Sequence, residues 1–306
     1  MRRTALTWAL ALALLLALPP RLFAGPEVVA SIAPVHSLVA RVMQGAGRPH
    51  LLLPPGASPH HHALRPSDAA ALERAALVFW VGPRLERWLT RSLTTLAAGA
   101  RVVRLADAPG LTRLALRQGA VFAAHEHASE PDHDEAEIDP HLWLDPDNAK
   151  LWLDAIAAAL AGADPARRAL YLANAAAARA ELDALAAEIE VRLAPVRGRP
   201  FVVLHDSFQY FERRFGIEAA GAVAPGDGRA PGPARIARIR DRIRALGPVC
   251  LFREPQLRSA LAATVAAGAG ARIALLDPLG AGLPPGPDLY PDLLRGLADS
   301  LADCLG

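Results

Sequence analysis

The chain has 306 residues, of which 52% are hydrophobic, 21% charged and 5% aromatic. This length suits one large domain or, as we expect, two domains of about 150 residues each. The 27 prolines and 23 glycines follow no fixed period, which excludes collagen-like and low-complexity classes. The formal net charge of +2 argues against a nucleic-acid-binding protein with a basic surface.

Residues 1–24 predict a secretory signal peptide. Arg2 and Arg3 are followed by an apolar stretch, residues 5–18, that is short for a membrane span, and Ala24 is a small residue at the expected cleavage point. No cysteine follows the apolar stretch, so we expect no lipid anchor. Cleavage lowers the basic residues from 33 to 30 against 31 acids, a net charge of about −1. We therefore expect an exported, soluble protein.

In the first part of the mature chain, short apolar runs alternate with amphipathic stretches. This alternation is typical of βαβ units and a mainly parallel sheet. We expect strands at residues 28–32, 50–53, 77–81 and 102–105, and helices at residues 35–43, 67–76 and 83–96.

Residues 164–194 predict a long connecting helix. Asp164 followed by Pro165 is a typical helix start, with an acidic N-cap and proline in the first turn. No glycine or further proline occurs before Pro195, and strong helix formers fill the interval. The alternative is an ordinary surface helix broken in its middle. The position between two βαβ-type halves favours a helix that holds two lobes in a nearly fixed relation.

The same alternation returns in the last part of the chain. The predicted fold class is therefore α/β, with two βαβ-type lobes at residues 25–163 and 195–306 and mainly parallel sheets. We expect strands at residues 201–204, 218–223, 249–252 and 273–276, and helices at residues 233–246, 258–267 and 290–305.

Cys250 and Cys304 are the only cysteines, and 54 positions separate them. In an oxidising compartment a lone pair is most simply a disulfide. The alternative is a thiolate pair on a metal, which this spacing without a CxxC partner disfavours.

Three histidines and one aspartate lie in loops or at the ends of expected strands. His60 ends a turn-rich loop, and His141 lies between two Asp-Pro pairs, at residues 139–140 and 145–146. His205 closes an expected strand, and Asp277 follows another. Ligands of open α/β sheets bind beyond the carboxyl ends of strands, so these residues can meet in a cleft between the lobes. Three imidazoles and one carboxylate suit Zn²⁺, whereas Mg²⁺ and Ca²⁺ sites use more oxygens. Asp139, Asp145 and Asp206 are candidates for orienting the imidazoles.

Residues 124–139 contain three histidines and seven acids with no basic residue. One interpretation is a solvated loop that is disordered without metal. The other is an auxiliary collector that binds a second metal ion weakly, and we keep both. The three histidines are His125, His127 and His133.

Motifs for catalysis are absent from the sequence. It contains no H-E-x-x-H, no Walker loop and no G-x-S-x-G nucleophile elbow. We therefore expect a binding protein and no enzyme. The alternative class is a secreted zinc hydrolase, in which an activated water replaces Asp277 and a general base stands beside it.

Five segments carry a family resemblance: PPGASPH (54–60), LRPSD (64–68), DPHLWLDP (139–146), HDSFQYF (205–211) and EPQ (254–256). In this order they resemble the zinc-binding periplasmic proteins of ABC transporters, the ZnuA type. The similarity covers nearly the whole mature chain. It implies two α/β lobes joined by a long rigid helix, with the metal held between the lobes, and it supports the disulfide.

The resemblance implies that His60, His141 and His205 bind the metal, with Asp277 as the carboxylate ligand. Glu254 or a water is the alternative in the fourth position. Manganese-binding relatives usually carry glutamate where this chain has His205, which favours zinc over the same-family alternatives manganese and iron(II).

The chain departs from the family pattern in the run that follows the first histidine. His61 and His62 extend His60, and either could compete as a ligand. The Ser-Pro-His context points to His60. The function that the resemblance implies is capture of Zn²⁺ and its delivery to an inner-membrane ABC permease with a cytoplasmic ATPase, by a protein we expect to be monomeric.

Overall fold

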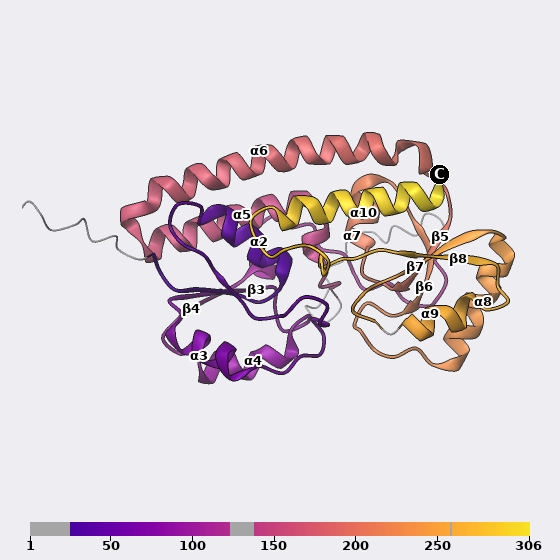
Figure 1. The fold of residues 1–306 in the computed structure, drawn as a ribbon, viewed down its shortest axis with the longest axis horizontal. Coiled ribbons are helices and arrows are strands. Elements are labelled where there is room, and N and C mark those ends of the chain that lie inside the picture. Colours follow the sequence, from indigo (N-terminus) through magenta and orange to yellow (C-terminus); the bar gives the residue numbers. More distant parts are fainter. Residues whose placement is uncertain (1–24, 123–137, 258) are drawn as a thin grey trace, which may run out of the picture.

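The computed structural model describes residues 25–122, 138–257 and 259–306. The predicted signal peptide and most of the acidic histidine segment lie outside these residues. Two four-stranded parallel sheets form two lobes, and helices cover them (Figure 1). The predicted two-lobed α/β fold is confirmed.

The N-terminal lobe has the strand order β2-β1-β3-β4. Every residue of β1 and β3 is buried, because helices cover both faces of a parallel sheet, and this explains their uninterrupted apolar sequences. The strands are β1 (Val28–Ala30), β2 (His50–Leu51), β3 (Leu77–Trp80) and β4 (Arg101–Arg104), with helices α2 (Ala33–Val42), α3 (Pro66–Arg74) and α4 (Thr90–Thr95) and the 3₁₀ turns η1 (Arg87–Leu89) and η2 (Leu105–Asp107).

The helix predicted over residues 83–96 begins later than expected. The buried carboxylate of Glu86 accepts hydrogen bonds from the backbone N–H groups of Val81 (2.9 Å) and Gly82 (3.0 Å). These bonds fold the preceding residues into a turn, so that only η1 and α4 are helical.

A long helix connects the lobes, as predicted. Helix α6 (Arg168–Leu193) has 26 residues, about 39 Å, and lies between the 3₁₀ turns η5 (Pro165–Arg167) and η6 (Ala194–Val196). The side chain of Asp164 does not cap it but binds Arg167 and Tyr171. In the described part of the chain, no helix combines the length and apolar character needed to cross a membrane.

The C-terminal lobe repeats the strand order of the first, as β6-β5-β7-β8. Helix α8 has the predicted bounds, whereas α5 and α7 were not predicted. The elements of this lobe are β5 (Phe201–His205), α7 (Gln209–Phe215), β6 (Ala219–Ala224), α8 (Pro233–Leu246), β7 (Val249–Arg253), α9 (Ser259–Ala266), β8 (Ala271–Leu275) and α10 (Leu289–Leu305). The N-terminal lobe ends, before α6, with η4 (Leu142–Leu144) and α5 (Pro146–Ala163).

Helix α10 is a second connection between the lobes. It runs beside α6 (Figure 1) and packs against α6 and α2. The backbone N–H of Tyr290 donates to Ser37 Oγ at 2.9 Å, and the hydroxyl of Tyr290 donates to the carbonyl of Trp143 at 2.7 Å. The last helix is therefore anchored on the N-terminal lobe as well as on its own.

The predicted disulfide is confirmed. It joins Cys250 in β7 to Cys304 in α10, with their Cα atoms 6.2 Å apart. The bond therefore fixes α10 to the sheet of the C-terminal lobe at the end opposite to its contact with Ser37.

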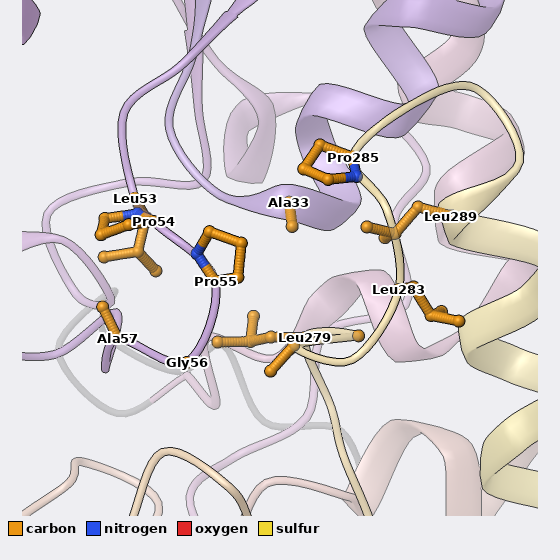
Figure 2. Close-up of a pocket in the computed structure, with 12 residues that line it drawn as sticks. Ala33, Leu53, Pro54, Pro55, Gly56, Ala57, Leu279, Leu283, Pro285 and Leu289 are labelled. Atoms are coloured by element: carbon orange, nitrogen blue, oxygen red, sulfur yellow. The ribbon is translucent and has the colours of Figure 1, made fainter.

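A small apolar pocket marks one place where the lobes meet. Figure 2 shows Pro54 and Pro55 on one side of it and Leu279, Leu283 and Leu289 on the other. The loop that leads to the first candidate histidine thus packs against the turn that follows the candidate aspartate.

Candidate metal site

His60 comes from the loop between β2 and α3. The indole N–H of Trp88 donates to the carbonyl of Pro59 at 2.8 Å, and the backbone N–H of His60 donates to Ser58 Oγ at 3.3 Å. Prolines restrict the backbone of this loop, and these two bonds help to hold the histidine backbone in place.

His141 directly precedes η4 and is buried. Its backbone N–H and its Nδ1 lie 3.0 and 2.7 Å from the same carboxylate oxygen of Asp139. The hydroxyl of Tyr210 donates to the carbonyl of Asp139 at 3.0 Å, which anchors this segment on the C-terminal lobe. Asp139 therefore orients His141, as predicted, and leaves Nε2 for a metal.

His205 is the last residue of β5 and is also buried. Strands β5 and β7 pair in parallel with Val203 beside Phe252, so two residues further along each strand His205 lies beside Glu254. Its Nδ1 is 3.2 Å from the Glu254 carboxylate, which also accepts a 2.9 Å bond from Ser207 Oγ. The sheet register thus provides the carboxylate that orients this histidine.

The three histidines converge from the two lobes. Their potential ligand atoms all lie within 4.8 Å of one another, and among residues 25–122, 138–257 and 259–306 no other group of three histidines, cysteines or acids does so. The Nε2 atoms of His60 and His205 are buried and have no hydrogen-bond partner within these ranges. Buried nitrogens without partners cost free energy unless something binds them, so they point to a ligand in the centre.

Burial and charge set the protonation of the site. Burial, with the neighbouring His205 and His141, holds the pKa of His60 well below its ordinary value, and burial with His205 does the same for the pKa of His141. Burial also lowers the pKa of His205, but the carboxylates of Glu254, Asp206 and Asp139, of which Glu254 contributes most, together outweigh burial and leave that pKa raised. Two of the three imidazoles are therefore neutral at pH 7, as metal ligation requires.

The predicted carboxylate ligand Asp277 follows β8 and is not part of the histidine cluster. Its Oδ1 accepts hydrogen bonds from the side-chain amide of Gln256 (2.8 Å) and the backbone N–H of Leu279 (3.0 Å), and its Oδ2 accepts one from the N–H of Ala281 (2.6 Å). Since a carboxylate oxygen has two lone pairs, Oδ2 keeps one for a metal. Its role as a ligand stays a prediction.

For two other residues, Asp206 and Asp145, the predicted role of orienting an imidazole was wrong. Asp206 forms an ion pair with Arg117, and Asp145 caps α5 by accepting from the backbone N–H of Asp147 at 2.9 Å. Glu254, which the sequence suggested only as a possible ligand, takes the orienting role beside His205. Of the histidines after His60, His62 packs against the ring of Trp88 and is not part of the cluster.

The geometry agrees with comparisons to known proteins. The chain is 45% identical over 304 residues to the high-affinity zinc uptake system protein ZnuA of Brucella abortus (strain 2308), with 91% of each chain covered. It is 41% identical over 306 residues to the protein of the same name from Paracoccus denitrificans, with 92% of each covered. A crystal structure of ZnuA superimposes with a TM-score of 0.78 at 26% identity, covering 92% of this chain and all of that one.

The profile of the family described as "Zinc-uptake complex component A periplasmic" matches residues 28–304. This match spans both lobes, α6 and all three clustered histidines. The chain therefore belongs to the family of periplasmic component A of zinc-uptake complexes.

Proposed function

We propose that this protein captures Zn²⁺ in the periplasm and delivers it to an inner-membrane ABC permease. The observation that carries the proposal is the convergence of three buried histidines from two lobes, with ligand atoms within 4.8 Å of one another. Relatives that share 45% and 41% of their aligned residues with this chain are named high-affinity zinc uptake proteins.

The donor set supports zinc over manganese. Imidazole nitrogens suit the borderline-soft Zn²⁺, whereas Mn²⁺ prefers carboxylate and other oxygen ligands. The two carboxylates nearest the histidines, Asp139 and Glu254, each lie beside an imidazole Nδ1. They are engaged in orienting ligands, so they are not available to activate a water, and this supports a binding protein over a hydrolase.

We propose His60, His141 and His205 as the zinc ligands, with Asp277 in the fourth position. An Asp277 carboxylate lowers the charge of the zinc site to about +1, which stabilises it between buried groups. Asp277→Asn should then weaken zinc binding more than it lowers the free energy of unfolding. Unchanged zinc affinity would instead assign the fourth position to Glu254 or a water.

We also propose that the chain is exported, cleaved near Ala24 and monomeric. In the proposed division, residues 25–163 form the N-terminal lobe, residues 164–194 the connecting helix and residues 195–306 the C-terminal lobe. The division is supported by the two sheets, since β1 to β4 precede α6 and β5 to β8 follow it.

The test is a competition titration of the purified chain without residues 1–24, stripped of metal. We expect one tightly bound Zn²⁺ per chain and a preference over Mn²⁺ of roughly a hundredfold or more, because of the three imidazoles. Equal affinity for both metals would contradict the zinc assignment. A chain that binds neither metal would contradict the proposed function itself.

A further inference from the structure

His60 differs from the other two clustered histidines in how its ring is held. His141 has Asp139 and His205 has Glu254 beside Nδ1. Within the described residues no side chain forms a hydrogen bond with a ring nitrogen of His60, and its Nε2 is buried without a partner. Metal-binding histidines are almost always oriented through their second nitrogen. Something other than a carboxylate must therefore orient this ring.

The backbone of Gly228 lies directly against the His60 ring. A Cβ atom added to Gly228 would lie 2.7 Å from Cγ, 2.9 Å from Cδ2 and 3.0 Å from Cβ of His60. These atoms are at the base of the imidazole and not at the end of a flexible chain, so the ring cannot yield without leaving its position. Gly228 also has a φ of +75°, in the left-handed region that favours glycine.

Gly228 belongs to the loop of residues 225–232, between β6 and α8 in the C-terminal lobe. The loop is seated beside the cluster, because a Cβ on Gly226 would lie 2.7 Å from the carbonyl oxygen of Asp206, the residue after His205. The N–H of Gly228 donates to the carbonyl of Pro225 at 3.2 Å and closes the turn. The loop therefore contacts one histidine and the neighbour of another, on opposite lobes.

We propose that Gly228 is a positioning residue of the metal site. Its bare backbone, from the C-terminal lobe, sets the orientation of the His60 imidazole from the N-terminal lobe, in place of the carboxylate that the other histidines have. The inference rests on the proposed zinc-binding function. It follows that the three-histidine site is complete only while the 225–232 loop lies against His60.

The first test compares Gly228→Ala with Gly270→Ala, which lies in the same lobe with a φ of +80° and has no atom within 4 Å of an added Cβ. Both variants place alanine at an unfavourable φ, so both should lose stability to a similar degree. Only Gly228→Ala should lose zinc affinity, by about tenfold or more, the effect typical of losing an orienting partner. The Co²⁺-loaded form should also lose part of its visible absorption, because that absorption reports tetrahedral geometry. Gly228→Asn, which accepts a left-handed φ more easily, brings the same Cβ contact should the alanine variant not fold.

A double-mutant cycle with His60→Ala tests whether the effect acts through the ring. Once the imidazole is gone, Gly228→Ala should change zinc affinity by less than about twofold, since two residues that act through one contact are not additive. Wild-type zinc affinity in the Gly228 variants, or the same loss with and without His60, would overturn the proposal. A wild-type chain that binds no zinc would instead overturn the proposed function, so the two failures are distinguishable.

Discussion

In the N-terminal lobe, His141 and its orienting Asp139 are two residues apart on one segment, whereas in the C-terminal lobe His205 and Glu254 come from neighbouring strands. The two lobes have the same strand order, yet one forms its histidine–carboxylate pair locally and the other through the register of its sheet. The C-terminal pair therefore depends on an intact sheet, and the N-terminal pair depends mainly on one short segment.

The two lobes also differ in the charge of their histidines. The pKa values of His60 and His141 lie well below the ordinary value because these rings are buried among other histidines. The pKa of His205 is raised because the neighbouring carboxylates, Glu254 foremost, together outweigh the effect of burial. Without zinc, the N-terminal lobe thus presents neutral imidazoles, and the C-terminal lobe presents the one that protons occupy first.

The largest expected effect comes from removing one histidine from either lobe. His141→Ala and His205→Ala should each weaken zinc binding by about 4 kcal/mol, roughly a quarter to two-fifths of the binding free energy typical of structural zinc sites. Isothermal titration with a competing chelator measures this loss. The matched control is His61→Ala, outside the cluster, which should leave zinc affinity unchanged. A large difference between the two variants would contradict a site in which the histidines of both lobes are equivalent ligands.

The disulfide between β7 and α10 should stabilise the C-terminal lobe more than the N-terminal lobe. Replacing Cys250 and Cys304 together with serine should lower the free energy of unfolding by about 2 to 4 kcal/mol, because the unfolded chain regains the freedom of a 54-residue loop. Urea unfolding, followed by hydrogen exchange of each lobe, measures the effect. We expect β7 and α10 to lose protection and β1 and β3 to keep it. Equal loss in both sheets would show that the lobes unfold as one unit.

The sequence predicted most of the fold because buried parallel strands are apolar runs. The eight strands of the described residues were each expected within a few residues of their observed bounds. Helix α7 was not expected, because its seven residues are held by the burial of Tyr210, Phe211 and Phe215 and not by helix-forming sequence. Helix α5 was also missed, although Asp145 followed by Pro146 is the same start signal that predicted α6.

For the site, the histidines were predictable and their partners only in part. Asp139 could be paired with His141 because the two are adjacent in sequence. Glu254 could not be paired with His205, because the strand order β6-β5-β7-β8 departs from chain order. Asp206 was expected beside an imidazole, but Arg117 pairs with it from 89 positions away. Pairs formed by sheet order and lobe contacts are not visible in sequence spacing.

A smaller effect is expected from removing the orienting carboxylates. Asp139→Asn and Glu254→Gln should each lower zinc affinity by about 10- to 100-fold, because the imidazole loses the partner that fixes its proton on Nδ1. The control is Asp145→Asn, which affects the cap of α5 and no clustered histidine. Each variant is checked by zinc titration and by urea unfolding. A loss of stability without loss of affinity would assign these carboxylates a purely structural role.

The smallest effect, and the one that most directly separates the lobes, is the pH dependence of zinc binding. Zinc binds the neutral imidazole, so zinc affinity is greatest above the raised pKa of His205 and decreases as the pH falls through that pKa. The decrease should begin above pH 6.5, the ordinary pKa of histidine. The slope in this range should be about one decade per pH unit, for one proton displaced. The lowered pKa values of His60 and His141 delay their competition to more acidic solutions. Glu254→Gln removes the largest of the charges that raise the pKa of His205, so the onset should move to lower pH, while Asp139→Asn, whose charge contributes less to that pKa, should move it less. Chelator competition across this range measures both onsets, and an unshifted onset in Glu254→Gln would show that His205 is not the group that titrates.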